Sequence, residues 1–108
     1  MPDPRDITTP EDVHACLDAP RALLFKYGTH CPISAAARGQ LGEFIAERPD
    51  ALVYQVAVDQ HRDVSDYIAQ RLGVPHASPQ AFLLESGEIR WQATHHAISR
   101  DVLADRWG

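Results

Sequence analysis

One of the two cysteines in this chain has neighbours that are typical of thiol chemistry. Cys31 begins the segment Cys31-Pro32-Ile33-Ser34, which has the spacing of a Cys-x-x-Cys redox motif but ends in a hydroxyl group. A second cysteine at the end of the motif would close an internal disulfide, which serine cannot do. Disulfide exchange at Cys31 therefore needs an external thiol to release the group that the cysteine has captured.

The residues that follow Cys31 favour its ionised form. Pro32 has no N–H and a φ preset for the first position of a helix, so Cys31 falls at the N-cap, with the amides of Ile33 and Ser34 directed toward its sulfur. Helix N-termini lower the pKa of a cysteine from about 8.5 to roughly 3.5 to 7.5. A stabilised thiolate is also a good leaving group. We therefore expect Cys31 to be the catalytic nucleophile, with Ser34 able to donate a hydrogen bond to it.

Four residues in the second half of the chain are candidates for substrate binding: His76, Ser78, Pro79 and His95. A cis proline at Ser78-Pro79 would turn residue 78 toward the sulfur, and its free N–H and C=O would then pair with an extended substrate segment. The alternative is an ordinary loop proline. His76 and His95 are expected near the site by their place in the fold and would supply a proton or a substrate contact. Solvated histidines without a role are the equally weighted alternative.

The second cysteine, Cys16, is expected to be structural. It shares one face of a predicted helix with Val13 and Leu17, which places it in the core. A resolving role, in which Cys16 forms a disulfide with Cys31, is the less favoured alternative.

The histidines do not have the spacing of a metal site. His14 and Cys16 lie two residues apart on a helix and diverge, while His95 and His96 would point to opposite faces of a strand. We therefore predict no metal.

The order of predicted elements indicates an α/β fold that would place Cys31 at the end of a strand. Thr9-Pro10 is typical of a helix start, Gly73 of a helix end, and Ser86-Gly87 of a tight antiparallel hairpin. The order αβαβαββα predicts a single thioredoxin-like domain over residues 1–108, with a central mixed four-stranded sheet flanked by helices. The expected elements are a short helix from residue 10, a strand within 21–28, a helix over 32–48, a strand over 51–59, a helix over 62–72, strands over 80–85 and 88–94, and a final helix capped by Ser99.

Composition restricts the partners. The 108 residues are 44% hydrophobic, enough for one domain with a modest core, and the net charge of −5 comes without any basic cluster. Nucleic acid and anionic membranes are therefore not expected as partners. The N-terminus lacks the pattern of a secretory signal and no apolar run is long enough to span a bilayer. These features predict a cytoplasmic protein, which we expect to be a monomer.

The segment Thr29-His30-Cys31-Pro32-Ile33-Ser34 resembles the Thr-x-Cys-Pro-Ile-Ser active site of the monothiol bacilliredoxins, thioredoxin-fold proteins of the bacillithiol system. Similarity to that family continues at Tyr67–Ala69, Gly73–Val74, His76–Gln80 and Trp91–Ser99. His96 differs from the basic residue expected there, which leaves an anion-binding role at that position open.

The resemblance implies a reaction and its partners. Cys31 would attack a mixed disulfide between bacillithiol and a client protein, take the bacillithiol onto itself, release the reduced client, and be regenerated by free bacillithiol. The implied partners are S-bacillithiolated clients, bacillithiol as co-substrate and its reductase system, with no tightly bound cofactor. Thr29 and His30 would then contact the substrate beside Cys31.

Lys26 is similar in position to a lysine that precedes the cysteine of monothiol glutaredoxins and pairs with a carboxylate of the thiol cofactor. If Lys26 faces the site, the similarity implies that it binds a carboxylate of bacillithiol. The alternative is a strand lysine that extends its ammonium to water.

Two other classes of function remain open. One is a non-enzymatic thioredoxin-like module that binds client peptides at Ser78-Pro79, which a Cys31 thiol titrating near the free value of about 8.5 would favour. The other is an iron–sulfur carrier in which Cys31 and an external thiol hold a cluster across a dimer. Pro32 directly after the cysteine makes this carrier less favoured.

Overall fold

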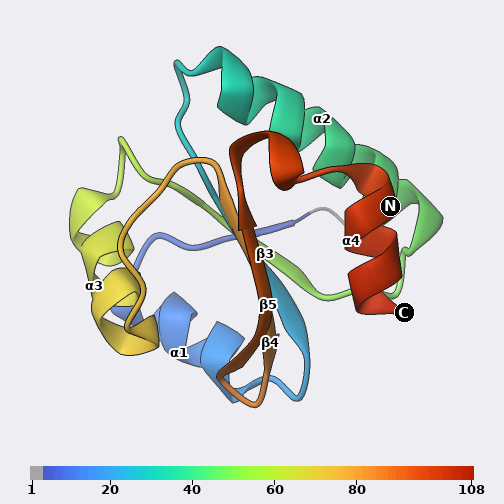
Figure 1. Cartoon of the computed structure of the whole chain (residues 1–108). Coiled ribbons are helices and arrows are strands. Elements are labelled where there is room, and N and C mark those ends of the chain that lie inside the picture. Colours follow the sequence, from blue (N-terminus) through green and yellow to red (C-terminus); the bar gives the residue numbers. More distant parts are fainter. Residues whose placement is uncertain (1–3) are drawn as a thin grey trace.

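The computed structural model describes residues 4–108 and is organised around one mixed five-stranded sheet (Figure 1). The strand order is β1-β3-β2-β4-β5. The first three strands in this order are parallel, and β4 is antiparallel to both β2 and β5. The strands span Arg5–Asp6 (β1), Ala22–Tyr27 (β2), Val53–Ala57 (β3), Gln80–Glu85 (β4) and Glu88–Thr94 (β5).

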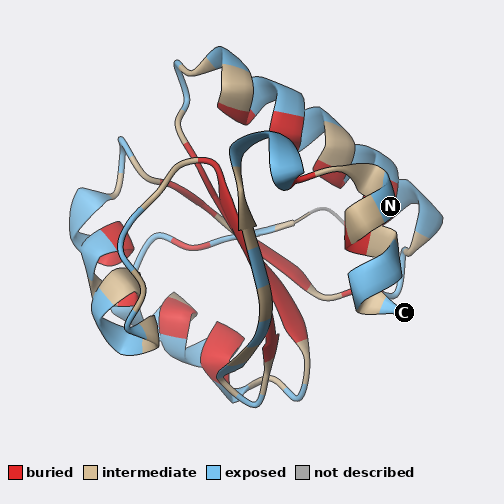
Figure 2. Cartoon of the chain, viewed as in Figure 1, coloured by how far each residue is buried: buried red, intermediate tan, exposed pale blue. Residues whose placement is uncertain are grey.

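Helices cover both faces of the sheet (Figure 1). The helices are α1 (Pro10–Asp18), α2 (Pro32–Glu47), α3 (Arg62–Leu72) and α4 (Arg100–Trp107). One core layer joins α2 and α4 to the sheet, and the other joins α1 and α3 to its opposite face. The central strand β2 is buried along its whole length (Figure 2), because alternate side chains enter the two layers. The α/β, thioredoxin-like prediction is confirmed.

The sheet has five strands, one more than the sequence predicts. Arg5 and Asp6 pair with Tyr54 and Gln55 of β3, and the Gln55 amide group donates to an oxygen of Asp6 at 2.9 Å. Ile7, buried directly after β1, fixes this edge to the core. A strand of two residues has no alternating pattern to detect, so only its partner strand reveals it.

Local signals set the ends of several elements as predicted. Thr9 and Asp12 form a reciprocal capping box at the start of α1. Gly73 ends α3 in the left-handed conformation, with φ of 68°. Ser86 and Gly87 both have positive φ, 49° and 80°, as a two-residue hairpin link requires. These bonds and dihedrals involve residues close in sequence, which is why the sequence predicts them.

The segment after β5 differs from the prediction. His95 and His96 lie in a short 3-10 helix, η1 (His95–Ala97), so they do not alternate across a strand as expected. Buried Ile98 follows, in the core layer of α2 and α4. The turn brings η1 against α2. Within residues 4–108, no helix is long and apolar enough to cross a membrane.

Candidate active site

Cys31 is the N-cap of α2, as Pro32 predicts. It has an extended backbone, with φ −105° and ψ 120°, and its carbonyl accepts the first helical hydrogen bond from the Ala35 amide at 3.0 Å. The side chain is half-buried and the thiol is free. The end of β2 thus delivers a partly exposed sulfur to the start of a 16-residue helix.

The amides at the start of α2 stabilise the Cys31 thiolate. The Ser34 amide lowers the pKa of the Cys31 thiol most, the Ile33 amide acts in the same direction, and partial burial opposes both. The Ser34 hydroxyl adds a smaller lowering. Within residues 4–108, the Cys31 side chain accepts no hydrogen bond from the backbone amides of the first turn of α2. The amides therefore favour the charged form of a sulfur that remains open to an approaching disulfide.

Ser34 also connects the segments on either side of the sulfur. It is 0% exposed, its Oγ accepts from the Gly28 amide at 3.0 Å, and it lies 3.5 Å from the Ser78 Oγ. Gly28 precedes Cys31 and Ser78 comes from the loop before β4. The hydroxyl that replaces the second cysteine of a dithiol motif thus has a structural partner as well as a place near the thiolate.

The Ser78–Pro79 peptide bond is cis, and Pro79 is buried. In the described part of the chain, neither the amide nor the carbonyl of Ser78 has a backbone partner. The next carbonyl, that of Pro79, accepts from the His95 amide at 3.0 Å. Ser78 therefore offers an unpaired backbone edge close to Ser34 at the start of α2.

Asp59 is a site residue that sequence reasoning missed. Its carboxylate accepts the Thr29 amide at 3.1 Å and the Thr29 hydroxyl through its other oxygen. The Thr29 hydroxyl and then its amide lower the pKa of Asp59, and the charge of neighbouring His30 acts in the same direction. One signal was available: Asp59 follows β3 at the same sheet edge where the parallel neighbour β2 leads to Cys31.

The Lys26 side chain extends from β2 on the face of the sheet that α1 and α3 cover. Its register partners Val56 and Gln80 flank it, and α2 covers the opposite face. Lys26 is 1% exposed, and burial lowers the pKa of its ammonium to about 8, while nearby Asp66 opposes the shift. Lys26 therefore faces α3 and not the underside of α2.

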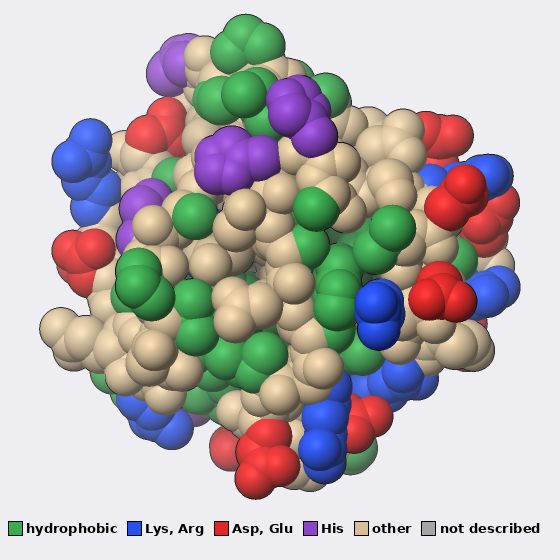
Figure 3. Space-filling view, in the orientation of Figure 1, with side chains coloured by type: hydrophobic (Ala, Val, Ile, Leu, Met, Phe, Trp, Pro, Cys, Tyr) green, Lys and Arg blue, Asp and Glu red, His purple; other side chains and the backbone are tan. Residues whose placement is uncertain are grey.

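The histidines that the sequence predicts near the site lie in different environments. His76 Nδ1 lies 3.2 Å from the Ser65 Oγ, and burial followed by the Lys26 charge lowers the pKa of the imidazole. His95 instead lines a groove between α2 and η1, with Ile33. His30 is exposed beside Cys31. Figure 3 shows histidine side chains gathered at the end of the molecule where α2 begins.

Cys16 is a core residue, as predicted. It is 1% exposed and packs in the α1 and α3 layer, and burial raises the pKa of its thiol to about 12. Across residues 4–108, no three His, Cys, Asp or Glu side chains gather to hold a metal ion.

The fold and the site together define a thioredoxin-fold protein with a partly exposed cysteine of lowered pKa at the start of α2. Residues 5–103 match the family described as monothiol bacilliredoxin BrxC, and the chain belongs to this family. Membership in this family implies a thiol redox function related to bacillithiol.

Solved structures agree with this assignment. The chain is 34% identical to a protein of thioredoxin fold described provisionally as an oxidoreductase, with a TM-score of 0.89 and coverage of 96% of this chain and 93% of the other. It is 18% identical to oxidised mitochondrial thioredoxin 3 from Saccharomyces cerevisiae, with a TM-score of 0.74 and coverage of 95% and 92%. It is 13% identical to thioredoxin from Trypanosoma brucei brucei, with a TM-score of 0.79 and coverage of 98% and 88%. The two thioredoxins support the fold alone.

Proposed function

We propose that this chain is a cytoplasmic monothiol oxidoreductase that removes bacillithiol from S-bacillithiolated proteins. The observation that carries the proposal is the environment of Cys31: a half-exposed sulfur whose pKa is lowered by the Ser34 and Ile33 amides. The only other thiol in the sequence, that of Cys16, is buried in the core. This arrangement suits a carrier that must pass its adduct to an external thiol.

The reaction has two exchanges. In the first, the Cys31 thiolate attacks the bacillithiol sulfur of the client mixed disulfide, the client sulfur leaves as a thiolate, and a Cys31–bacillithiol disulfide forms. In the second, the thiolate of a free bacillithiol attacks the bound bacillithiol sulfur and expels the Cys31 thiolate. The products are the reduced client and bacillithiol disulfide, which the reductase system returns to the thiol. The amides that stabilise the Cys31 thiolate make it a good leaving group in the second exchange.

Neighbouring groups have separate roles in this scheme. The unpaired backbone of Ser78 would hold an extended client segment by short β-pairing. Ser34 would donate a hydrogen bond to the leaving thiolate. Thr29, held by Asp59, and exposed His30 would line the approach to the sulfur.

The lowered pKa of Cys31 favours this catalytic role over a purely client-binding module. A binding module has no use for an activated thiolate, and its cysteine would titrate near the free value of about 8.5.

The test is an intact-mass measurement after the protein is mixed with a bacillithiolated client peptide. We expect one bacillithiol adduct on Cys31 and loss of the adduct from the peptide. Cys31→Ala should abolish the transfer, whereas the matched control Cys16→Ala should retain most of it. A folded Cys16→Ala protein without activity would instead indicate an internal Cys31–Cys16 disulfide, and wild-type protein that takes up no bacillithiol would refute the proposal.

A further inference from the structure

A pocket of about 280 Å³ lies where the three parallel strands end. Its lining residues are Asp6, Ile7, Thr8, Tyr27, Ala57, Gln60 and His61. Asp6, Tyr27 and Ala57 are the last residues of β1, β2 and β3, and the carboxyl ends of parallel strands are where α/β folds bind ligands. None of the residues that the sequence predicts for the thiol site lines this pocket.

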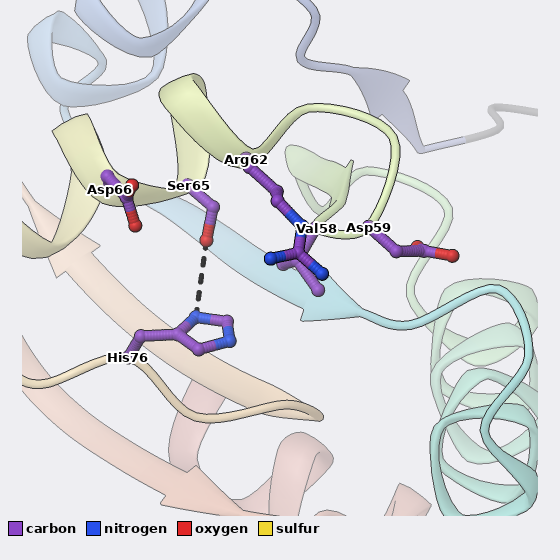
Figure 4. Close-up of a pocket in the computed structure, with 6 residues that line it drawn as sticks. All are labelled: Val58, Asp59, Arg62, Ser65, Asp66 and His76. Carbon is purple, nitrogen blue, oxygen red and sulfur yellow. Dashed lines mark hydrogen bonds between the residues drawn. The ribbon is translucent and has the colours of Figure 1, made fainter.

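The loop between β3 and α3 joins the pocket to the thiol site. Its residues Gln60 and His61 line the pocket. Asp59 directly precedes them, and its carboxylate points away from His76 (Figure 4) and accepts from the Thr29 amide at 3.1 Å. Thr29 belongs to the turn between β2 and α2. The pocket is therefore next to that turn and does not include the sulfur.

The order of the strands determines which part of a client would meet the pocket. β3 and β1 lie on one side of β2, and β4 lies on its other side. Ser78, whose unpaired backbone would hold the client, directly precedes the cis proline that leads into β4. A client segment that pairs with Ser78 and crosses the sulfur beyond the end of β2 therefore continues toward the ends of β3 and β1, where the pocket lies.

Tyr27 is a buried residue with a free hydroxyl group. It is 8% exposed, its ring stacks on Phe25, and the Arg38 guanidinium lies 4.3 Å from the ring centroid. Within residues 4–108, the only tyrosine hydroxyl with a hydrogen bond is that of Tyr67. The only fully covered side-chain nitrogen or oxygen without a partner in that range is Arg21 Nε. The Tyr27 Oη is therefore open to the water of the pocket that this residue lines.

The pocket also contains a carboxylate that is only half used. Asp6 accepts from the Gln55 amide group through Oδ1, and its Oδ2 has no partner in the described part of the chain. His61 precedes α3 as its N-cap and makes no capping hydrogen bond through its side chain. With histidine counted as neutral, Asp6 is the only charged residue among those that line the pocket.

A lysine ammonium is the group that matches this lining. The pocket offers a cation one carboxylate oxygen, which suits a compact charge with three donors better than the planar fork of an arginine. Buried Ile7 and Ala57 provide apolar surface for a lysine alkyl stem. An anionic ligand would instead be repelled by the Asp6 charge.

We propose that this pocket binds a lysine side chain of the client protein while the client exchanges at Cys31. The inference rests on the proposed function, because it needs a client at the sulfur, and it adds a selectivity among clients. Asp6 would accept from the ammonium, with the Tyr27 hydroxyl and the Gln60 amide group beside it. Tyr27 lies four residues before Cys31, so an extended client would carry the lysine within about four residues of its own cysteine.

The first test measures the attack of Cys31 on client peptides whose cysteine is joined to 2-nitro-5-thiobenzoate. The Cys31 thiolate attacks the peptide sulfur, a Cys31–peptide disulfide forms, and the coloured nitrothiobenzoate leaves as a thiolate. The peptides carry one lysine at successive positions on either side of the cysteine. Each is compared with the same peptide containing norleucine, which has an alkyl side chain without the ammonium. We expect lysine at the favoured position to react about two- to fivefold faster, as for an exposed ion pair.

Three variants locate the lysine preference. Asp6→Asn should remove it, because the amide keeps an oxygen for Gln55 but loses the charge. Tyr27→Phe should reduce it by a smaller factor, since only the hydroxyl is lost. The matched control is Asp50→Asn, an exposed aspartate before β3 at the opposite end of that strand, which should keep the full preference. Equal rates for lysine and norleucine at every position, or equal behaviour of the two aspartate variants, would overturn the inference.

The second test needs no exchange at the sulfur. At neutral pH, n-butylamine, which is the lysine side chain without its backbone, should shift the NMR signals of the Tyr27 and His61 rings, whereas n-butanol should shift neither. Asp6→Asn should lose the butylamine shift. These shifts together with the lysine preference, in a protein that takes up no bacillithiol, would support the lysine pocket and refute only the removal of bacillithiol. Butylamine that leaves both rings unmoved would overturn the inference.

Discussion

The two cysteines occupy opposite environments within the same fold. Cys31 precedes the first turn of α2, where the Ser34 and Ile33 amides lower the pKa of its half-buried thiol. Cys16 lies within α1 and packs into the core, where burial raises the pKa of its thiol to about 12.

The contrast comes from position within a helix and from access to water. The first amides of an α-helix have no intrahelical acceptor, so they are free to stabilise an anion at the N-cap. Amides farther along the helix are already bonded to carbonyls. A sulfur placed beside those amides and among apolar side chains is desolvated without compensation. The lowered pKa of Cys31 is therefore a property of the helix start and not of cysteine as such.

The largest expected difference is in alkylation. With iodoacetamide near pH 7, native protein should be modified at Cys31, whereas Cys16 should react only after denaturation. The rate at Cys31 should rise with pH through a midpoint below the free-thiol value of about 8.5 and then level off, because the thiolate is the reacting form. Peptide mapping by mass spectrometry across a pH series measures both sites. Equal labelling of the two cysteines in native protein would contradict the difference between their environments.

Serine substitution should separate the two sites by stability. Cys16→Ser places a hydroxyl group in an apolar layer and should lower the free energy of unfolding by about 1 to 3 kcal/mol. Cys31→Ser should leave the unfolding free energy nearly unchanged, because serine is a favoured N-cap residue and the side chain meets solvent. Urea denaturation of both variants gives the two values. A Cys31→Ser protein destabilised as strongly as Cys16→Ser would contradict the assignment of Cys31 to chemistry and not to packing.

The smallest expected effect is at Gly28, which adjoins the reactive sulfur. A methyl group there would lie 3.5 Å from the Cys31 Cβ and 3.7 Å from the Ser78 Oγ, both ordinary contacts, and its φ lies outside the left-handed region. Gly28→Ala should therefore change the unfolding free energy by no more than about 0.5 to 1 kcal/mol and leave the alkylation midpoint of Cys31 in place. A marked shift of that midpoint would show that the packing against Gly28 also sets the pKa.

Prediction from the sequence was most accurate where the evidence is local. The helix over 62–72 and both hairpin strands have the predicted bounds, because Gly73 and the Ser86-Gly87 link determine their own backbone conformations. The prediction was wrong where contacts between segments distant in the sequence determine the local structure. The two residues of β1 form a strand only through pairing with β3. His95 and His96 enter η1 as the chain turns against α2, so they do not alternate across a strand as predicted.

The sequence by itself determined the position of the Cys31 sulfur at the start of a helix, because Cys31 and Pro32 define that start through the backbone of adjacent residues. Tertiary structure alone decided what surrounds that sulfur. Asp59 reaches Thr29 across 30 residues and Ser34 meets Ser78 across 44, and Lys26 comes beside Asp66 and His76 on the α3 face of the sheet. Such contacts follow from strand order and register, which bring distant segments to one sheet edge and leave no signal in the spacing of neighbouring residues.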